Sequence, residues 1–409
     1  MGESRRRILP HGASPEEKYA AEDRPLFATG YGCRLTKMPG ADIIRTDHWI
    51  GKGAAHRMNR RWIGFVMLLL FLLPMEALAE NKQLVVTFVG DCTLGSEDRL
   101  RDTDTAFDSY LKNNGYTYFF EKVQSVIAHD DLTVANLEGV FSNSASGKVK
   151  KTYNFRGPVS FVNVLTQSSI ECVNIANNHS LDYGANGMKD TVNTLTKAGV
   201  HWFGTNDVYH RTCVFHKNGV KIGFLGVEIR YWGANQDLIK DQVQALKKAG
   251  CQVIVGTFHG GTEYATLRDQ SQEKIARRLI QYGCNIVIGH HPHVLQGIDV
   301  TDGVTICYSL GNFVFGGNAR IKQQRALYTA LFQFTFTFDE NNNYLGHQLN
   351  IIPAHVSGDT EMNTYQPRLV TGGAANTVLK QIQRDTPFSL KPYVKGVGAV
   401  QDFVAAPKQ

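Results

Sequence analysis

The sequence predicts an α/β protein built around a mixed sheet. From residue 84 onward, apolar runs of strand length alternate with longer segments of helical period, which is typical of α/β folds. Asn218-Gly219 and Asp302-Gly303 each separate two apolar runs, a pattern that favours tight hairpins and therefore some antiparallel strands. There is no internal repeat and no low-complexity linker, so one domain is the simplest interpretation.

The expected elements follow one another from residue 84. Gly199 and Gly250 come just after two helical segments, where a glycine commonly ends a helix. Strands are expected at 84–89, 132–135, 172–176, 220–225, 253–258, 286–288, 305–310, 328–338 and 344–352. Helices are expected before about 128 and at 159–167, 185–197, 238–249, 271–282 and 374–384. The segment 357–409 is more loop-like and is expected to be an extension or cap.

Residues 58–79 have the three parts of a secretory signal peptide. A basic start at Met58-Asn-Arg-Arg precedes the apolar run 63–73, and Ala77-Leu78-Ala79 is a small-residue cleavage site. The run is shorter than the roughly 20 residues of a comfortable membrane span, although an uncleaved anchor is the alternative. We expect an exported protein, periplasmic or extracellular. Residues 1–57 are then either an extension upstream of the true start or a disordered tail.

The net charge and the positions of the cysteines argue against a nucleic-acid-binding protein and against a disulfide-rich fold. Residues 1–79 contain 12 of the 43 Lys and Arg and 8 of the 37 Asp and Glu, so the rest has a net charge near +2. A net charge so close to zero does not indicate nucleic-acid binding, which usually requires a strongly basic surface. Most cysteines of this part lie beside apolar runs, which favours buried thiols over a disulfide framework, but the pairing cannot be read from sequence. Six of the seven cysteines lie in this part, and five of them are beside or within such runs: Cys92, Cys172, Cys251, Cys284 and Cys307, with Cys213 as the sixth.

Histidines gather after one predicted strand. Ile286–Ile288 is followed by Gly289 and then by three histidines within four residues. Neutral imidazole is a common metal ligand, and one structural role does not explain three histidines at one strand end. Polar residues also end four other predicted strands, and such strand ends bind ligands in open α/β sheets. The five strand ends carry Asp91, Glu138, Asn178-His179, His259, and His290, His291 and His293.

The types of side chain indicate the chemistry. Carboxylate, amide and imidazole groups without thiolates suit one or two divalent ions such as Mn, Fe, Zn or Mg. A carboxylate bridging two ions would serve hydrolysis by activated water, and a histidine that is not a ligand could protonate the leaving oxygen. Any one such residue is commonly only a helix cap or turn. Five in chain order are harder to explain in that way.

The motifs resemble those of a known family. They are Gly90-Asp91, Asn136-Leu137-Glu138, Ala176-Asn177-Asn178-His179, His259-Gly-Gly-Thr-Glu263, Gly289-His290-His291-Pro292-His293 and Ser309-Leu310-Gly311-Asn312. Their order resembles the CapA family of capsule-synthesis and poly-γ-glutamate-associated proteins, which is similar to the calcineurin-like metallophosphoesterase superfamily. The resemblance covers roughly Leu84 to Val356. It implies a four-layer αββα sandwich over 80–356 with two metals at the strand ends.

The resemblance also implies roles for single residues. Asp91 would bind the first metal, Glu138 would bridge, and Asn178 and His259 would bind the second. His291 and His293 match the superfamily's His-x-His pair, one for each metal, and His179 would be the acid beside the phosphate. The first site departs from the wider pattern, because Thr93 stands where a histidine is usual. Additional candidates are His290, Asn312 and Glu263.

Two classes of function follow. The first is an exported, metal-dependent phosphoesterase-like enzyme in capsule or poly-γ-glutamate synthesis, acting on a phosphoester or an anionic polymer. The second is a non-hydrolytic factor that binds such a polymer or a membrane synthase complex, which the residue Thr93 favours. A polymer-cleaving amidohydrolase would also fit a metal-activated water.

Overall fold

The computed structural model describes residues 81–206, 209–317, 319–321 and 323–408. The expected extension at 1–57 and the expected signal peptide at 58–79 lie outside these ranges. Within them, no helix combines the length and the apolar character needed to cross a membrane.

One continuous sheet in two halves forms the centre of the described part. The first half holds β1 (Lys82–Cys92), β2 (Leu132–Leu137), β5 (Cys172–Asn174), β14 (Tyr328–Phe338) and β15 (Tyr344–His355). The second half holds β9 (Val220–Glu228), β10 (Val253–His259), β11 (Ile286–His290), β12 (Ile298–Thr301) and β13 (Val304–Cys307). Between them lies β6 (His201–Thr205), which pairs with β5 and, through Thr205 and Val227 only, with β9.

The two halves face each other across an apolar core. Side chains alternate along each strand, so Val255 on β10 enters the core between the halves while Ile254 points to the outer face. Phe88 from β1 and Phe334 from β14 meet edge to face in the same inner core, with ring centroids 5.7 Å apart.

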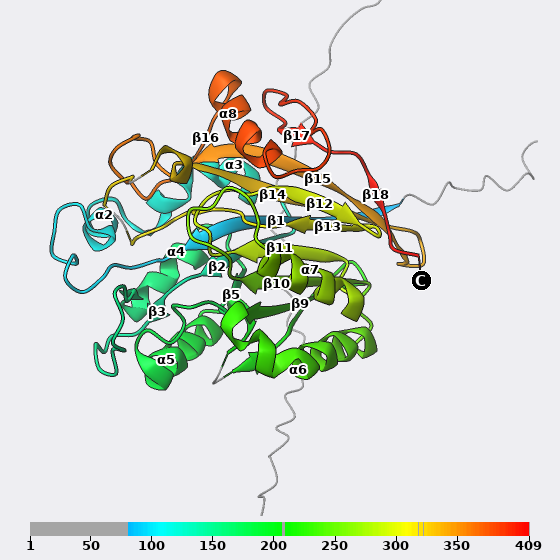
Figure 1. The fold of residues 1–409 in the computed structure, drawn as a ribbon. Helices are drawn as coiled ribbons and strands as arrows, with labels where there is room; N and C mark the ends of the chain where they lie inside the picture. The colour runs from blue at the N-terminus through cyan, green and yellow to red at the C-terminus, as the bar shows by residue number, and fades with distance from the viewer. Residues whose placement is uncertain (1–80, 207–208, 318, 322, 409) are drawn as a thin grey trace, which may run out of the picture. The chain divides into compact units, whose positions relative to one another are not determined.

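Helices cover both outer faces. On the second half, α6 (Ile229–Lys248) and α7 (Gln270–Tyr282) bury one apolar stripe against the strands (Figure 1). On the first half, the outer apolar cluster includes side chains of α2 (Phe107–Asn114), α3 (Gln124–Ile127), α4 (Asn163–Thr166) and α5 (Gly184–Lys197). The order helix, sheet, sheet, helix confirms the predicted four-layer αββα sandwich.

The strand predictions agree with the structure better than the helix predictions. The hairpins at Asn218-Gly219 and Asp302-Gly303 are confirmed as β8 (Cys213–Lys217) with β9 and as β12 with β13. The helix expected before residue 128 is instead two short helices and 3-10 turns, because Gly115 ends α2. Helix α6 begins nine residues earlier than the expected residue 238 and contains a kink at Asn235. Strand β6 was not predicted, because its short sequence His-Trp-Phe-Gly-Thr has no clear alternation of apolar and polar residues.

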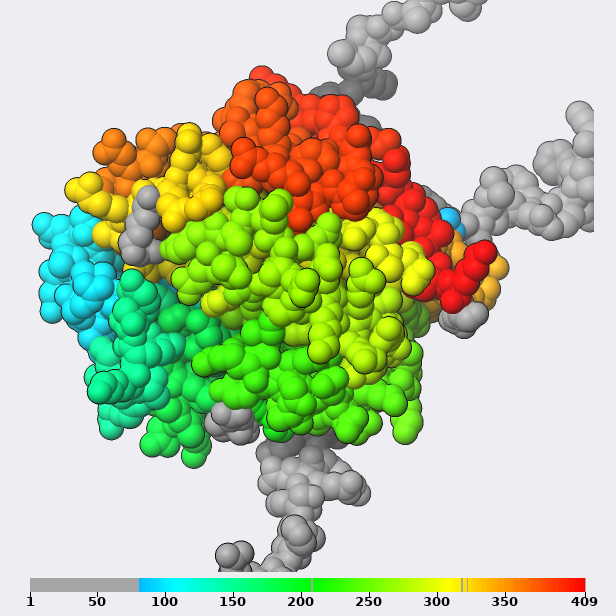
Figure 2. Space-filling view, viewed as in Figure 1, coloured from blue at the N-terminus to red at the C-terminus, as the bar shows by residue number. Residues whose placement is uncertain are grey.

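The C-terminal segment packs on the first half of the sheet. Short strands β16 (Arg368–Leu369), β17 (Ala399–Val400) and β18 (Val404–Ala405) all pair with β15. Helix α8 (Gly372–Gln383) contributes Val378, Leu379 and Ile382 to the core between the halves. Figure 2 shows this segment, coloured orange to red, lying over the yellow and green parts of the chain.

A backbone segment ties the carboxyl ends of the two halves together. The Gly311 carbonyl accepts a hydrogen bond from the Asp91 amide at 2.9 Å, and the Leu310 amide donates to the Gly289 carbonyl at 3.3 Å. A β-carbon on Gly90 would lie 2.0 Å from the Gly311 oxygen, so only glycine allows this approach. Backbone packing therefore explains why residue 90, just before Asp91, is a glycine.

We predict that Gly90→Ala destabilises the protein by about 2 kcal/mol or more, because backbone atoms must move to admit the methyl group. Gly233→Ala is the matched control: it lies in α6 with no atom within 4 Å of the added carbon, so it should be neutral or stabilising by up to about 1 kcal/mol. Urea unfolding of both variants measures the difference. Equal midpoints for the two would contradict the proposed close approach.

A buried histidine gives the fold a pH dependence. His347 lies in the inner core, where its ring nitrogens contact the Thr305 and Tyr344 hydroxyls at 2.6 Å each. Burial lowers the pKa of His347 to about 4. The unfolded chain binds a proton at this residue near pH 6.5 and the folded chain does not. Stability from this group is therefore present above pH 6.5 and is lost as the pH falls toward 4.

We predict that His347 contributes about 3 kcal/mol of the stability lost between pH 7 and pH 4. His347→Gln keeps hydrogen-bonding capacity but cannot take up the proton. Its urea midpoint should therefore fall less than that of wild type over this range. If wild type and variant lose stability in parallel, His347 is not the responsible group.

Candidate metal centre

The strand topology brings the predicted site residues to one place. Asp91 lies at the end of β1, Glu138 directly after β2, and Asn178 in the turn after β5, so these three come from adjacent parallel strands. His259 and His290 end the paired strands β10 and β11 of the other half. The facing halves therefore present their polar strand ends to each other.

One group of ligand atoms surrounds the His259 ring. Its Nε2 atom lies 2.8 Å from Asn178 Oδ1, 3.1 Å from His291 Nδ1 and 3.6 Å from Glu138 Oε1. The donor atoms of Glu138, His259 and His291 all lie within 4.8 Å of one another. Three converging donors and a nearby amide oxygen are a ligand set that a divalent ion can use.

A second group shares Glu138 with the first. Asp91, Glu138 and His293 offer donor atoms within 4.8 Å of one another, and His293 Nδ1 lies 3.3 Å from Asp91 Oδ2. Glu138 thus stands between two groups, each with its own histidine of the His291-Pro-His293 turn. This is the arrangement that a bridging carboxylate requires.

The polar atoms of Glu138 fit a bound cation. Both carboxylate oxygens are buried and have no hydrogen-bond partner among the described residues. A buried carboxylate without partners is costly, and nearly all such groups in proteins are paired or bind metal. A divalent ion on either side would satisfy both oxygens.

Burial and mutual repulsion set the protonation of the centre. Burial, reinforced by the Asp91 charge, raises the pKa of Glu138 well above its usual value. Burial also lowers the pKa of His259, and it lowers that of His291 to about 4. Burial opposes the ionised form of Asp91, but hydrogen bonds from His290 and His293 hold its pKa well below the usual range. Two neutral imidazoles and one carboxylate are thus already in the form that binds metal.

The histidine turn has an unusual backbone. His291 and His293 have positive φ angles of 100° and 58°. Each such residue costs on the order of 1 kcal/mol, and neighbouring contacts must hold it. The Tyr264 amide donates to the Pro292 carbonyl at 2.7 Å, and the His291 amide donates to Asp91 Oδ2 at 3.3 Å. These contacts aim both rings at the shared carboxylate.

His179 lies beside the two groups without belonging to either. Its Nε2 atom is 3.8 Å from Glu138 Oε1, and its Nδ1 atom is 2.8 Å from Asp182 Oδ2. Lys151 forms an ion pair with Asp182, and its Nζ lies 3.1 Å from His179 Nδ1. Burial lowers the pKa of His179, while Asp182 opposes that effect. The ring is therefore oriented by its Nδ1 side, with Nε2 directed toward the site.

Three further residues of the centre received no role from the sequence, although Asn136 stands in one of the quoted motifs. Asp182 follows His179 by three residues, a spacing that could have been noticed. Lys151 comes from a distant loop that carries no local signal. Asn136 donates from Nδ2 to Asp91 Oδ1 at 2.8 Å and lies 3.3 Å from His259 Nδ1, so it contacts both halves.

The additional candidates lie at the rim of the centre. His290 belongs to neither group that contains Glu138, and its Nδ1 contacts Asp91 Oδ1 at 3.1 Å. Asn312 Oδ1 accepts from His293 Nδ1 at 2.9 Å, which orients that ring. Glu263 is exposed and lies within 4.8 Å of His291 and His293 ligand atoms. Thr93 is buried, and its hydroxyl has no hydrogen-bond partner in the described part of the chain.

Comparison with known proteins assigns the family. The model of the family described as "Bacterial capsule synthesis protein PGA_cap" matches residues 85–317, more than half of the chain. The chain belongs to the PGA_cap family. The matched range includes every candidate metal ligand and His179.

Two CapA proteins and a mycobacterial protein are similar to this PGA_cap chain. "Capsule biosynthesis protein CapA" of Bacillus anthracis is 27% identical over 331 residues, covering 75% of this chain and 74% of that protein. "PGA biosynthesis protein CapA" of Bacillus subtilis is 29% identical over 57% of this chain and 63% of its own length. A Mycobacterium tuberculosis relative, described as a probable polyglutamine synthesis accessory protein, is 28% identical over 56% of this chain and 66% of its own.

Solved structures give weaker likenesses for this PGA_cap member. A Staphylococcus aureus protein described as a 5′-nucleotidase has a TM-score of 0.42 and 12% identity, covering 76% of this chain and 61% of that one. The purple acid phosphatase PPD1 of yellow lupin has a TM-score of 0.39 and 10% identity, with 76% and 57% coverage.

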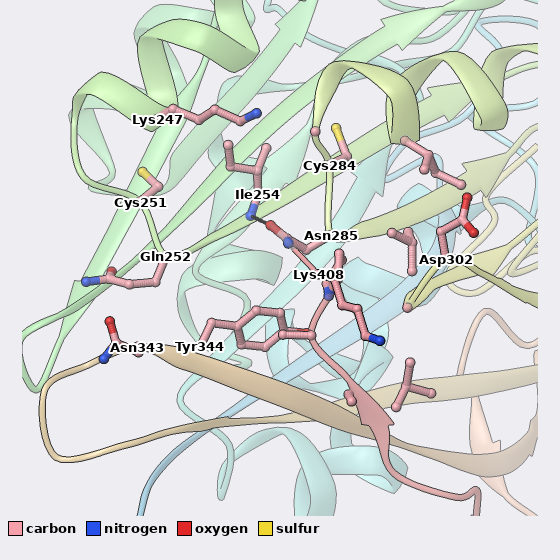
Figure 3. Close-up of a pocket in the computed structure, with 18 of the residues that line it drawn as sticks. Lys247, Cys251, Gln252, Ile254, Cys284, Asn285, Asp302, Asn343, Tyr344 and Lys408 are labelled. Carbon is pink, nitrogen blue, oxygen red and sulfur yellow. Dashed lines mark hydrogen bonds between the residues drawn. The ribbon is translucent and has the colours of Figure 1, made fainter.

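A separate cavity of the PGA_cap chain lies away from the candidate ligands. A cavity of about 1360 Å³ opens at the amino-terminal edge of β10 and β11, and Lys247, Asn285, Tyr344 and Lys408 are among its lining residues (Figure 3). None of the candidate ligands lines it. We therefore do not assign the reaction to this cavity, because the candidate ligands lie at the carboxyl ends of the strands and the cavity lies at their amino-terminal ends.

We predict that Glu138→Gln changes metal binding and stability in opposite directions. The neutral amide removes the bridging charge, so the increase in melting temperature on adding Mn²⁺ or Zn²⁺ should be lost. The same change removes the cost of burying a carboxylic acid whose ionised form is disfavoured first by burial and then by the Asp91 charge, so without added metal the variant should unfold at a higher urea concentration than wild type. The role of Glu138 would be contradicted if the variant unfolded at a lower urea concentration than wild type without metal and if added metal still raised its melting temperature.

Proposed function

We propose that this protein is an exported, metal-dependent hydrolase of the phosphoesterase type that acts in capsule or poly-γ-glutamate synthesis. One observation carries the proposal: the carboxylate of Glu138, which has no hydrogen-bond partner among the described residues, is shared by two ligand groups, and the oriented ring of His179 lies beside it. Membership of the PGA_cap family and the names of the CapA relatives support the biological setting.

The proposed ligands divide between two ions. Asp91, Glu138 and His293 would hold the first, and Glu138, Asn178, His259 and His291 the second. Divalent ions at these groups, such as Mn, Fe, Zn or Mg, supply positive charge for a phosphoryl group and lower the pKa of water. We propose divalent ions of this group and do not select one of the four.

The chain's own residues supply the acid. Asp182 accepts a hydrogen bond from His179 Nδ1, which stabilises the imidazolium and leaves Nε2–H free to donate to the leaving oxygen. Lys151 balances the buried Asp182 charge and limits movement of the loop that carries it. His179 would therefore be the general acid, and Asp182 its positioning residue.

A non-hydrolytic role is the second candidate. The group around Asp91 has three ligating residues, and Thr93, which stands where the superfamily has histidine, offers no imidazole. A centre with one weak metal site would bind an anionic polymer without turnover. Such a protein would act as an assembly factor beside a membrane synthase complex, and the signal peptide expected at 58–79 would place it outside the cytoplasm.

We predict that His179→Ala lowers kcat by about 10²-fold to 10⁴-fold while metal content stays at the wild-type level. His293→Ala should lose both activity and metal. Hydrolysis of p-nitrophenyl phosphate and bis-p-nitrophenyl phosphate with Mn, Zn and Mg, together with metal analysis, measures both effects. His216→Ala is the control, because this exposed histidine lies outside both ligand groups.

The outcomes separate the two functions. Turnover that falls in His179→Ala but not in His216→Ala supports the hydrolase. Bound metal with no turnover on either ester, combined with metal-dependent binding of poly-γ-glutamate, supports the assembly factor. A protein that binds none of these ions would reject both.

A further inference from the structure

Phe155 contacts both members of the pair that would donate the proton. Its ring lies against the His179 ring, with centroids 4.4 Å apart and an angle of 40° between the planes. Its backbone amide donates to Asp182 Oδ2 at 2.6 Å, and the same oxygen lies 2.8 Å from His179 Nδ1. One residue therefore touches the imidazole through its side chain and the carboxylate through its backbone.

The Phe155 ring also packs against Phe315. These two rings meet edge to face with centroids 5.8 Å apart, and the Phe315 ring lies 5.0 Å from the His293 ring. Both phenylalanines are buried. A β-carbon on Gly317 would lie 2.7 Å from an atom of each phenylalanine ring, so the glycine leaves the space that the pair occupies. A row of aromatic rings thus runs from His179 to a candidate metal ligand.

The segment 149–155 is bonded to Asp182 at both of its ends. The Val149 amide donates to the Asp182 carbonyl at 2.9 Å, and the Phe155 amide donates to the Asp182 side chain. The Phe155 carbonyl accepts from the Val140 amide at 3.1 Å, at the start of β3 (Val140–Phe141). These bonds fix the Phe155 backbone between β3 and the turn that carries the acid pair, so the fold sets the direction of the ring.

A histidine that donates a proton must keep one ring nitrogen directed at the leaving oxygen. The bond from Nδ1 to Asp182 fixes one point of the His179 ring, but one bond does not prevent the ring from tilting about that point. A packed aromatic neighbour limits the tilt and excludes water from that side of the imidazole. A misplacement of about 1 Å in a catalytic group can lower the rate by on the order of 10²-fold.

We propose that Phe155 is a positioning residue for the general acid, because its ring fixes the plane of His179 while its amide fixes the Asp182 carboxylate. The proton moves from His179 Nε2 to the oxygen of the leaving group, and Phe155 takes no part in that transfer. The inference rests on the proposed hydrolase function for its kinetic test, whereas its structural test needs no turnover.

The dependence of the rate on the leaving group tests the role in catalysis. p-Nitrophenolate is a weak base and needs less help from an acid than the more basic phenolate. In Phe155→Leu, the fall in kcat should therefore be about 10-fold larger for phenyl phosphate than for p-nitrophenyl phosphate. The KM values and the content of bound metal should stay at the wild-type level, because Phe155 is not among the candidate ligands.

Phe161→Leu is the matched control. Phe161 is 6% exposed, against 4% for Phe155, and it packs against Phe107 in the outer apolar cluster of the first half. The same atoms are removed from a similarly buried position, so a purely structural loss should appear equally in both variants. Equal falls in kcat for the two esters in Phe155→Leu, or a preferential loss on phenyl phosphate in Phe161→Leu as well, would overturn the proposal.

Nuclear magnetic resonance of the full chain tests the positioning without any substrate. The Nδ1 proton of His179 is identified as the imidazole signal that His179→Ala removes. Its exchange with water should be slow in wild type and in Phe161→Leu. In Phe155→Leu it should be about 10-fold faster, because the ring leaves its bond to Asp182 more often.

The two measurements separate the inference from the proposed function. Equal exchange rates in wild type, Phe155→Leu and Phe161→Leu would overturn the positioning role, whatever the kinetics. If wild type hydrolyses neither ester, the proposed hydrolase function fails, and the exchange rate alone decides whether Phe155 holds the His179 ring in place.

Discussion

The hydrogen bonds between segment 310–313 and the ends of β1 and β11 hold the site together. The Asp91 amide and carbonyl bond to Gly311 and Phe313, and the Gly289 carbonyl bonds to Leu310. These bonds bring the carboxyl ends of the two halves within side-chain reach. The ligand distances that cross between the halves depend on that approach, because Asp91 and Glu138 belong to one half and His259, His291 and His293 to the other.

This approach has an electrostatic cost. It places the carboxylates of Asp91 and Glu138 in a buried position, together with several imidazoles. Hydrogen bonds satisfy Asp91, whereas the oxygens of Glu138 have no partner among the described residues. The protein therefore keeps one strongly destabilising group at the point where a cation would lie, which is the usual compromise between stability and function.

Backbone pairing between the halves is unevenly distributed around this centre. In the inner core, aromatic side chains of β1, β9 and β14 pack against one another. The junction at β6 has far fewer direct backbone bonds between the halves, yet β5, next to it, leads into the turn with Asn178 and His179.

The sequence by itself determined the class of fold and the set of candidate ligands. Alternating apolar runs and Asn-Gly or Asp-Gly turns are local signals, and polar residues after each strand could be found one strand at a time. Only the tertiary structure decided that Glu138 is shared by two ligand groups and that His290 contacts Asp91. It also decided that Asp182 and Lys151 orient His179. The reason is physical: strand order and facing of the halves come from long-range packing, which local periodicity does not encode. For the same reason β6 could be found only in the folded chain.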